Sequence, residues 1–340
     1  MNPIDPTAIR SLVVRAPNWL GDSVMALPAL RSLRAGVARA RITLVGPWAE
    51  LVRDQGVADR VIVYPRSFSR RLALTRPIRA LGADTALLLP NSLESALAAW
   101  LWGARRRVGF ATDGRAWLLT HPVPRPAQRP HQVDEYLELL KPFDLAPAET
   151  APAWTLAPSP ADAAVSRLLE EAELPEGVPL VGLHLGAAFG SSKLWPVERW
   201  ASLASELARL GLAPVLMGSS RELPVASEVL KRCPARVASL VGRDSPLLLP
   251  RLLSRLTLLV SGDTGVAQLA AALKVGVVAL FGPTDPRLTA PRGPRVLTIA
   301  KDVPCAPCFL PVCPIDHPCM RGIGVDEVVA AALTLAGTHA

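Results

Sequence analysis

The sequence predicts an α/β protein built from two doubly wound parallel sheets. Apolar, strand-like runs alternate with amphipathic, helix-like segments along almost all of the 340 residues. The strand-like runs are continuously apolar, which is typical of parallel sheets that are covered by helices on both faces. A proline-rich stretch, residues 145–160, interrupts the alternation near the middle of the chain. Because such a stretch forms neither a regular helix nor a central strand, we interpret it as a linker between two domains.

We therefore expect one domain over residues 1–150, a second over 160–324, and a last helix within 325–340 that could pack back on the first domain. The expected strands of the first half are 11–15, 40–46, 60–65 and 84–90. Those of the second half are 180–186, 212–218, 237–242, 256–262 and 275–282. Ligands of such sheets bind outside the carboxyl ends of the strands, so two facing domains would form a central cleft.

Composition excludes several classes of protein. Half of the residues are hydrophobic and 19% are charged, which is typical of packed domains rather than of disorder. The longest apolar runs, such as 96–104, are too short to span a membrane and are followed by Arg105, Arg106 and Arg107. The first ten residues lack the basic start and apolar stretch of a signal peptide. We expect a cytoplasmic protein.

Charge is distributed unevenly along the chain. The net charge is +8, and residues 1–150 hold 20 Lys/Arg against 13 Asp/Glu, a balance of +7. Such a half attracts a phosphorylated substrate or an acidic membrane surface, although a solvated surface in an arginine-rich chain explains it equally well. Nucleic acid is not an expected partner, because no known binding module and no interleaving of basic with aromatic residues is present.

The turn after the first expected strand lacks the glycine pattern of dinucleotide-binding folds. Residues 15–24 read RAPNWLGDSV, with Gly21-Asp22 in place of Gly-x-Gly-x-x-Gly. This disfavours a dehydrogenase. A carboxylate at this place could act as a general base toward a hydroxyl acceptor, or it could cap a helix over 23–34.

The loop after strand 180–186 has the composition of a phosphate site. Ser191 and Ser192 offer hydroxyl groups and Lys193 brings a cation, between glycines that keep the backbone open. The simpler interpretation is a surface loop.

Three further strands of the second half end in glycine with hydroxyl or charged residues. Asp263, Thr264 and Gly265 open a helix, where backbone N–H groups favour an anion, although Asp263 or Thr264 could instead only cap the helix. Glu222, after strand 212–218, could accept hydrogen bonds from the two hydroxyls of a ribose. Gly282 and Thr284 follow strand 275–282. Together these loops indicate a nucleotide site in the second half.

Four segments resemble glycosyltransferase family 9, the bacterial lipopolysaccharide heptosyltransferases. They are APNWLGDSVMALPAL (16–30), SSKLWPVERWASLA (191–204), SGDTGVAQLAAAL (261–273) and ALFGPTDPRLTAP (279–291). The resemblance runs from about residue 11 to about residue 333 and is greatest toward the heptosyltransferase II branch. It implies the GT-B architecture, which consists of two Rossmann-like domains.

The resemblance also implies an activity and its partners. ADP-L-glycero-D-manno-heptose would be the donor, and the first heptose of the Kdo–lipid A inner core would be the acceptor, at the inner-membrane surface. Transfer would invert the anomeric centre without a metal ion or other cofactor. By motif, Asp22 corresponds to the catalytic base, with Asn18 and Gly21 on the acceptor side. The donor-binding positions would be Ser191, Ser192, Lys193, Glu222, Asp263, Thr264 and Gly265.

A cysteine-rich segment, residues 305–319, holds four of the five cysteines. Cys305, Cys308, Cys313 and Cys319 follow the spacing C-x₂-C-x₄-C-x₅-C, which on its own suggests zinc or an iron–sulfur cluster. The five prolines of residues 304–318 make the segment rigid, and related heptosyltransferases are metal-independent. We expect a reduced structural or acceptor-side loop and no metal, with zinc as the lesser alternative.

Two other functions stay open from the sequence. One is a different GT-B nucleotide-sugar transferase or a sugar-nucleotide epimerase, although an epimerase needs several acid/base residues and only Asp22 is well placed. The other is a zinc-binding interaction protein built on the cysteine-rich segment, in which Asp22 and Lys193 would be dispensable.

Overall fold

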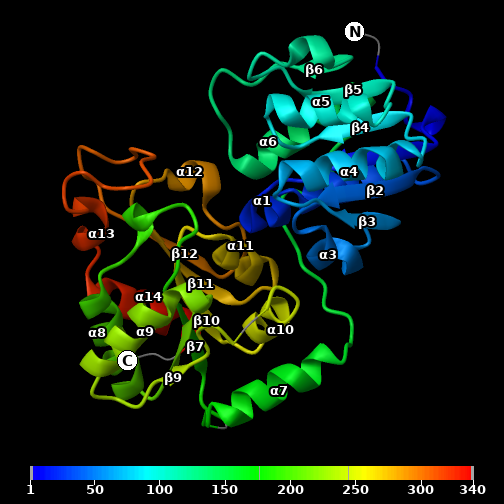
Figure 1. Cartoon of the computed structure of the whole chain (residues 1–340). Coiled ribbons are helices and arrows are strands. Elements are labelled where there is room, and N and C mark those ends of the chain that lie inside the picture. Colours follow the sequence, from blue (N-terminus) through cyan, green and yellow to red (C-terminus); the bar gives the residue numbers. More distant parts are fainter. Residues whose placement is uncertain (1–2, 176, 244, 338–340) are drawn as a thin grey trace. The chain divides into compact units, whose positions relative to one another are not determined.

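The structure is a computed structural model that describes residues 3–175, 177–243 and 245–337. The chain divides into two compact units, residues 1–155 and 156–340, and the division lies within the proline-rich stretch. Each unit contains one six-stranded, fully parallel sheet with helices on its faces (Figure 1). Within the described residues, no helix has both the length and the apolar character needed to cross a membrane.

The sheet of the first unit has the order β3-β2-β1-β4-β5-β6. Its strands are β1 (Ser11–Arg15), β2 (Arg41–Gly46), β3 (Arg60–Val63), β4 (Thr85–Leu88), β5 (Arg106–Phe110) and β6 (His121–Val123). Its helices are α1 (Leu20–Met25), α2 (Leu27–Gly36), α3 (Ala49–Val52), α4 (Phe68–Arg79), α5 (Leu93–Leu101) and α6 (Gln132–Glu138). The strand order reverses between β1 and β4, which makes this the switch point where doubly wound sheets bind ligands.

The sheet of the second unit has the equivalent order, β9-β8-β7-β10-β11-β12. Its strands are β7 (Leu180–His184), β8 (Ala213–Met217), β9 (Ala238–Ser239), β10 (Leu258–Gly262), β11 (Gly276–Phe281) and β12 (Val296–Ala300). Its helices are α7 (Ala161–Glu171), α8 (Val197–Arg209), α9 (Leu223–Arg232), α10 (Leu249–Leu253), α11 (Gly265–Ala272), α12 (Pro286–Thr289), α13 (Pro318–Gly322) and α14 (Val325–Ala336). Here the switch point lies between β7 and β10.

The expected helix over 23–34 is two helices. It begins earlier, at Leu20, and it breaks at Ala26, which ends α1 and begins α2. Pro28 explains the break, because proline has no N–H to donate and its ring clashes with the carbonyl group four residues before it. Asp22 therefore lies in the first turn of α1 and is not its N-cap, which is Trp19.

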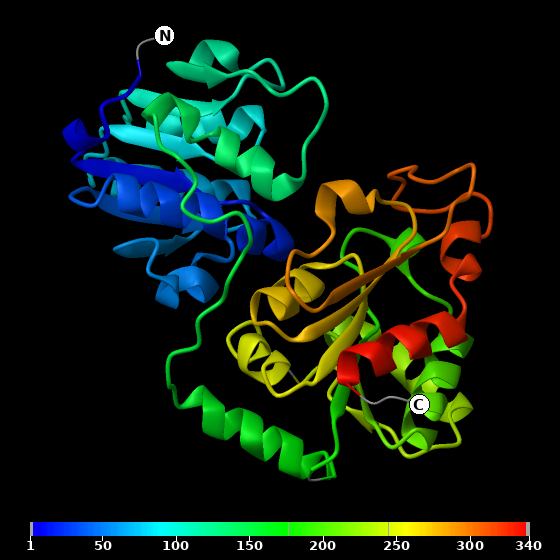
Figure 2. The same cartoon turned by 180° about the vertical axis from the view of Figure 1, so that it is seen from behind.

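The last helix packs on the second unit. Val328, Val329 and Ala332 of α14 are buried in the main apolar core of that unit, beside α8, β10 and β11 (Figure 2). The sequence left open that this helix packs back on the first domain, but its apolar face is occupied by the second unit. Residues 338–340 of the expected segment lie outside the described residues.

The proline-rich stretch is anchored at both ends. In the first unit, Arg31 donates to the carbonyl of Ala153 at 2.8 Å. The side-chain amide of Gln55 pairs with both backbone groups of Thr155, at 3.0 Å each. In the second unit, Arg251 donates to the carbonyl of Ala157 at 2.5 Å. Only Leu156 lies between Thr155, which is bonded to the first unit, and Ala157, which is bonded to the second.

Candidate active site

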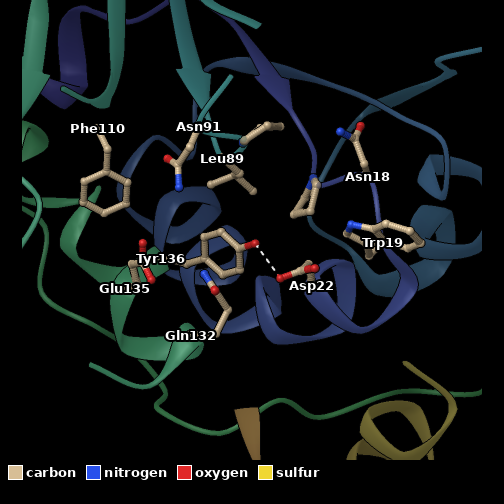
Figure 3. Close-up of a pocket in the computed structure, with 11 residues that line it drawn as sticks. Asn18, Trp19, Asp22, Leu89, Asn91, Phe110, Gln132, Glu135 and Tyr136 are labelled. Carbon is tan, nitrogen blue, oxygen red and sulfur yellow. Dashed lines mark hydrogen bonds between the residues drawn. The ribbon is translucent and has the colours of Figure 1, made fainter. Parts of the chain in front are cut away.

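A pocket of about 210 Å³ lies at the switch point of the first unit (Figure 3). Its walls come from the loop after β1, the end of β4, the end of β5 and one side of α6. The residues that line it are Pro17, Asn18, Trp19, Asp22, Leu89, Pro90, Asn91, Phe110, Gln132, Glu135 and Tyr136. Two of the three expected first-unit residues, Asn18 and Asp22, are thus brought to one pocket, whereas Gly21 is buried within α1 and does not line it.

The carboxylate of Asp22 faces Tyr136. The phenol of Tyr136 donates a hydrogen bond to Asp22 Oδ1 at 3.1 Å (Figure 3). Burial, followed by the charge of Asp22, raises the pKa of Tyr136 well above its usual value. The phenol therefore stays protonated and remains a donor, which fixes the orientation of the carboxylate.

A buried arginine fixes the side chain of Asn18 by a hydrogen bond. Arg15, the last residue of β1, is fully buried and donates to Asn18 Oδ1 at 2.6 Å. Its guanidinium lies 4.4 Å from the centre of the Tyr64 ring, and burial lowers its pKa. The indole of Trp48 donates to the carbonyl of Asn18 at 3.2 Å. These contacts fix the loop that leads into α1, whose first turn carries Asp22.

Glu135 forms the opposite wall of the pocket. Its carboxylate is buried and is paired with Arg125 at 2.8 Å and with Arg129 at 3.0 Å. The sequence analysis missed Gln132, Glu135 and Tyr136. Their helix-like segment follows a proline-rich loop, and no strand end marks it as part of a site.

The four second-half loops lie side by side. They follow β8, β7, β10 and β11, which are consecutive neighbours in the sheet. The loops after β7 and β10 meet across the switch point, where Lys193 Nζ pairs with Asp263 Oδ2 at 2.5 Å. Each of these two side chains is only 10% exposed. The expected phosphate and sugar residues are therefore in direct contact.

Asp263 gathers several donors around its carboxylate. Besides Lys193, the hydroxyl of Thr284 donates to Oδ2 at 2.8 Å, and that of Thr289 lies 3.5 Å from the same oxygen. Lys193 Nζ also lies 4.9 Å from the centre of the Phe189 ring. An ammonium group and two hydroxyls thus converge at the amino end of α11, a place that favours an anion.

Thr264 caps α11 and belongs to a partly buried chain of polar groups. Its side chain accepts from the backbone N–H of Ala267, and its hydroxyl lies 2.9 Å from that of Ser261. Ser261 lies 3.2 Å from His184 Nδ1. Burial lowers the pKa of His184 to about 4, so its imidazole is neutral at neutral pH. Gly265 is the first residue of α11.

Glu222 lies beside the end of β7. A methyl group built on Gly186 would come within 2.8 Å of the Glu222 carboxyl carbon, so the glycine leaves room for the carboxylate in this position. Ser219 donates to Glu222 Oε2 at 2.7 Å. Glu222 follows β8, and Lys193 follows the neighbouring strand β7. This position suits a carboxylate that accepts hydrogen bonds from the hydroxyls of a ribose.

The two serines before Lys193 have different environments. Ser191 is exposed, whereas Ser192 is buried and donates to the carbonyl of Leu310 at 2.6 Å. The backbone N–H of Ser192 donates to the carbonyl of Pro311 at 3.1 Å. A methyl group on Gly190 would come within 2.1 Å of that same Pro311 oxygen. The hydroxyl of Ser192 therefore fastens the cysteine-rich segment onto this loop, which differs from its expected donor-binding role.

All four cysteines of the cysteine-rich segment line one small cavity of about 60 Å³. Burial raises the pKa of the Cys319 thiol. Within residues 3–175, 177–243 and 245–337, no three His, Cys, Asp or Glu side chains are arranged to hold a metal ion. The hydrogen bonds from Ser192 to the carbonyls of Leu310 and Pro311 support a structural role for the segment.

The fold and the two sites define the class of protein. Two parallel, doubly wound domains, each with polar side chains gathered at its own switch point, form the GT-B architecture of glycosyltransferases. The model of the family described as "Glycosyltransferase family 9 (heptosyltransferase)" matches residues 71–318, which is more than half of the chain. The chain belongs to this family and is a glycosyltransferase.

Proteins similar to this chain include lipopolysaccharide and lipooligosaccharide heptosyltransferases. The chain is 29% identical over 297 residues to lipopolysaccharide heptosyltransferase 2 of Escherichia coli, covering 82% of this chain and 85% of that protein. It is 26% identical over 305 residues to lipooligosaccharide heptosyltransferase 2 of Haemophilus influenzae, covering 85% and 88%.

Solved structures agree with this assignment. The E. coli ADP-heptose lipopolysaccharide heptosyltransferase II superposes with a TM-score of 0.79 and 25% identity, over 96% of this chain and 98% of that one. A family 9 glycosyltransferase of Veillonella parvula superposes with a TM-score of 0.87 over the whole of both chains, at 20% identity. The latter likeness shows the fold alone.

Proposed function

We propose that this protein transfers L-glycero-D-manno-heptose from ADP-heptose to the first heptose of the lipopolysaccharide inner core. The observation that carries the proposal is the division of chemistry between two equivalent places. A pocket with a fixed carboxylate lies at one switch point, and a cluster of an ammonium group and hydroxyls lies at the other. The names of the heptosyltransferase 2 relatives support the sugar and the acceptor.

The second unit binds the donor. Lys193 and Thr284 contact the diphosphate, together with the backbone N–H groups at the start of α11. Because Lys193 and Asp263 pair with each other in the structure described, the arriving phosphate shares the ammonium group with Asp263, which then faces the sugar. Glu222 accepts the ribose hydroxyls.

The first unit binds the acceptor and supplies the base. Asp22 takes the proton of the acceptor hydroxyl while that oxygen forms a bond to the anomeric carbon of heptose. The bond from this carbon to the phosphate oxygen breaks on the opposite face, so the configuration inverts and ADP leaves. Lys193 offsets the negative charge that develops on the departing diphosphate.

The same proposal includes where the protein works. An inner-core acceptor is attached to lipid A, so the enzyme acts peripherally at the cytoplasmic face of the inner membrane. The surplus of positive charge in the first half supports this location, because that leaflet carries anionic lipids.

The test is heptose transfer by purified protein, from ADP-heptose to mono-heptosylated Kdo–lipid A, with and without EDTA. We expect product that is insensitive to EDTA and that vanishes with Asp22→Ala. Intact ADP binding without product would overturn the proposed sugar or acceptor and direct the search to other nucleotide-sugar transfers.

A further inference from the structure

Helix α5 buries small residues against the sheet and exposes large apolar residues to solvent, the reverse of an ordinary surface helix. The residues that face the sheet are small, namely Ser95, Ala96 and Ala99, and all three are buried. Leu93, Leu97 and Trp100 are exposed instead. Their spacing of four and three residues places them on one stripe. A helix that only covers a sheet turns such residues inward.

The core beneath α5 is complete without that stripe. Trp102 is fully buried and meets the Tyr64 ring edge-on, with 6.1 Å between ring centres. Ala96 and Ala99 fill the space between this pair and the strands. The exposed parts of Leu93, Leu97 and Trp100 are therefore open to a partner outside the unit.

The exposed stripe continues onto two neighbouring elements. Phe68 and Leu72 are exposed on α4, which packs beside α5 on the same face of the sheet (Figure 1). Trp117 is exposed in the short 3₁₀ turn Ala116–Leu118, which also contacts α5. We call these six residues the α4–α5 surface: Phe68, Leu72, Leu93, Leu97, Trp100 and Trp117. Each of them is between 41% and 75% exposed.

The segment that carries α4, beside the α4–α5 surface, is rich in positive charge. No acidic residue occurs between Asp59 and Asp84, whereas that interval contains Arg60, Arg66, Arg70, Arg71, Arg76 and Arg79. Asp59 and Asp84 pair with arginines, and Glu94 lies 3.6 Å from Arg71. Arg66, Arg70 and Arg76 are exposed and have no ion pair among the residues that the structure describes.

One end of this surface reaches the acceptor pocket. Pro90 and Asn91 line the pocket, and Leu93 begins the exposed stripe two residues later. Phe110 lines the same pocket, and the turn with Trp117 follows it in the chain. A substrate whose apolar part rests along the surface would thus have its polar part near Asp22.

We propose that the α4–α5 surface docks on an anionic lipid bilayer. Tryptophan, leucine and phenylalanine with arginine beside them are the residues that insert at the headgroup level and attract acidic lipids. A second copy of this chain fits less well, because a two-fold interface would bring the same arginines against each other. The inference rests on the proposed function for its biological purpose, but lipid binding itself requires no acceptor.

The test is flotation of the purified full chain with vesicles that contain no lipopolysaccharide. One set is phosphatidylcholine, and the other is phosphatidylethanolamine with about one quarter phosphatidylglycerol. We expect binding to the anionic vesicles that weakens as salt increases, and at least about tenfold weaker binding to phosphatidylcholine. Wild-type protein that floats with neither set would overturn the proposal.

Two variants locate the surface. Leu97→Ser with Trp100→Ser removes the apolar contribution, and Arg66→Gln with Arg70→Gln removes charge without touching the core. Each should reduce anionic-vesicle binding about tenfold or more. The matched control is Leu247→Ser, an exposed leucine of the second unit, which should bind as the wild type does. Equal binding by all three variants would overturn the proposal.

Stability and transfer measurements distinguish a loss of membrane docking from a folding defect. They also distinguish a failure of this inference from a failure of the proposed function. Both double variants should keep the thermal unfolding midpoint, ADP affinity and transfer to a water-soluble acceptor saccharide, while losing transfer to acceptor in vesicles. Vesicle binding without any heptose transfer would overturn the proposed function and leave the docking surface standing. A wild-type dimer that becomes a monomer in Leu97→Ser with Trp100→Ser, together with no vesicle binding, would instead assign the surface to a second copy.

Discussion

The first and second units share one strand order, so the ends of β1 and β7 occupy equivalent places beside the two switch points. Arg15 ends β1 and His184 ends β7. Arg15 is a buried, charged group that holds the acceptor-side loop through Asn18. His184 is a partly buried, neutral group that contacts Ser261, which in turn contacts Thr264, the N-cap of α11.

The residues that follow these two strands also differ in charge between the units. The first unit presents the carboxylate of Asp22, fixed by a phenol, and the second presents the ammonium group of Lys193, paired with Asp263. In the proposed function, one scaffold thus supports a base in one unit and an anion site in the other. The difference depends on a few loop residues rather than on the sheet, as expected of a widely reused fold.

The strongest test of this division is Asp22→Asn. The amide keeps the shape of the side chain but cannot accept the proton, so turnover should fall about 10³-fold. ADP affinity should stay within about twofold by calorimetry, because the proposed ADP site belongs to the other unit. A large loss of ADP affinity would show that the two sites are not divided as described.

Lys193→Ala should act on the other side of the division. Removing the ammonium group leaves Asp263 without its ion pair and deprives the diphosphate of a cation. ADP should bind about 10–100-fold more weakly, and transfer should fall with it. Lys231→Ala is the matched control, since that exposed lysine lies 3.8 Å from Glu228 and should change neither quantity. Unchanged ADP affinity in Lys193→Ala would contradict the phosphate assignment.

Tyr136→Phe should sharpen the role of the first pocket. Losing the hydrogen bond to Asp22 frees the carboxylate to rotate, so kcat should fall about fivefold, with ADP affinity unchanged. Tyr64→Phe removes a comparable bond, from a buried phenol to Glu94 at 2.9 Å, and should lower stability without lowering kcat. If both variants lose stability alone, Tyr136 does not position the base.

The smallest expected effect is a pH dependence in the second unit. Burial lowers the pKa of His184 to about 4 from an ordinary 6.5, so the unfolded chain binds its proton first as pH falls. The stability contributed by the neutral imidazole is complete above about pH 6.5 and is lost progressively toward pH 4. At pH 5.5 the loss should be about 1 kcal/mol. Urea unfolding of wild type and His184→Gln measures it: the difference between them should change across this interval and not above it.

The central strands were predictable because their chemistry is unambiguous. β1, β2, β4, β7, β8, β10 and β11 are continuous apolar runs, and the sequence places all of them within a few residues. Strands β5, β6 and β12 were not predicted. β5 begins with arginines, β6 has three residues including Pro122, and β6 and β12 are edge strands with less need for apolar residues on both faces.

The sites were predictable only where they follow a strand. Asp22, Lys193, Asp263 and Glu222 each follow a strand end, and the sheet order alone brings the last three to adjacent loops. Tyr136 and Glu135 come from a helix that folds back on the pocket, and such a return depends on tertiary packing. Ser192 shows the reverse case, since its hydroxyl suited a phosphate loop but is used by the carbonyl of Leu310.

The two anchors of the proline-rich stretch have a consequence for the encounter of the substrates. Thr155 is fastened to one unit and Ala157 to the other, so the free tether between them has a reach of about 7 Å. A tether this short keeps the local concentration of one unit around the other high, whatever the concentration of enzyme in solution. In the proposed division of the substrates between the units, bound donor and bound acceptor therefore meet as parts of one molecule, and that encounter does not slow when the complex is diluted.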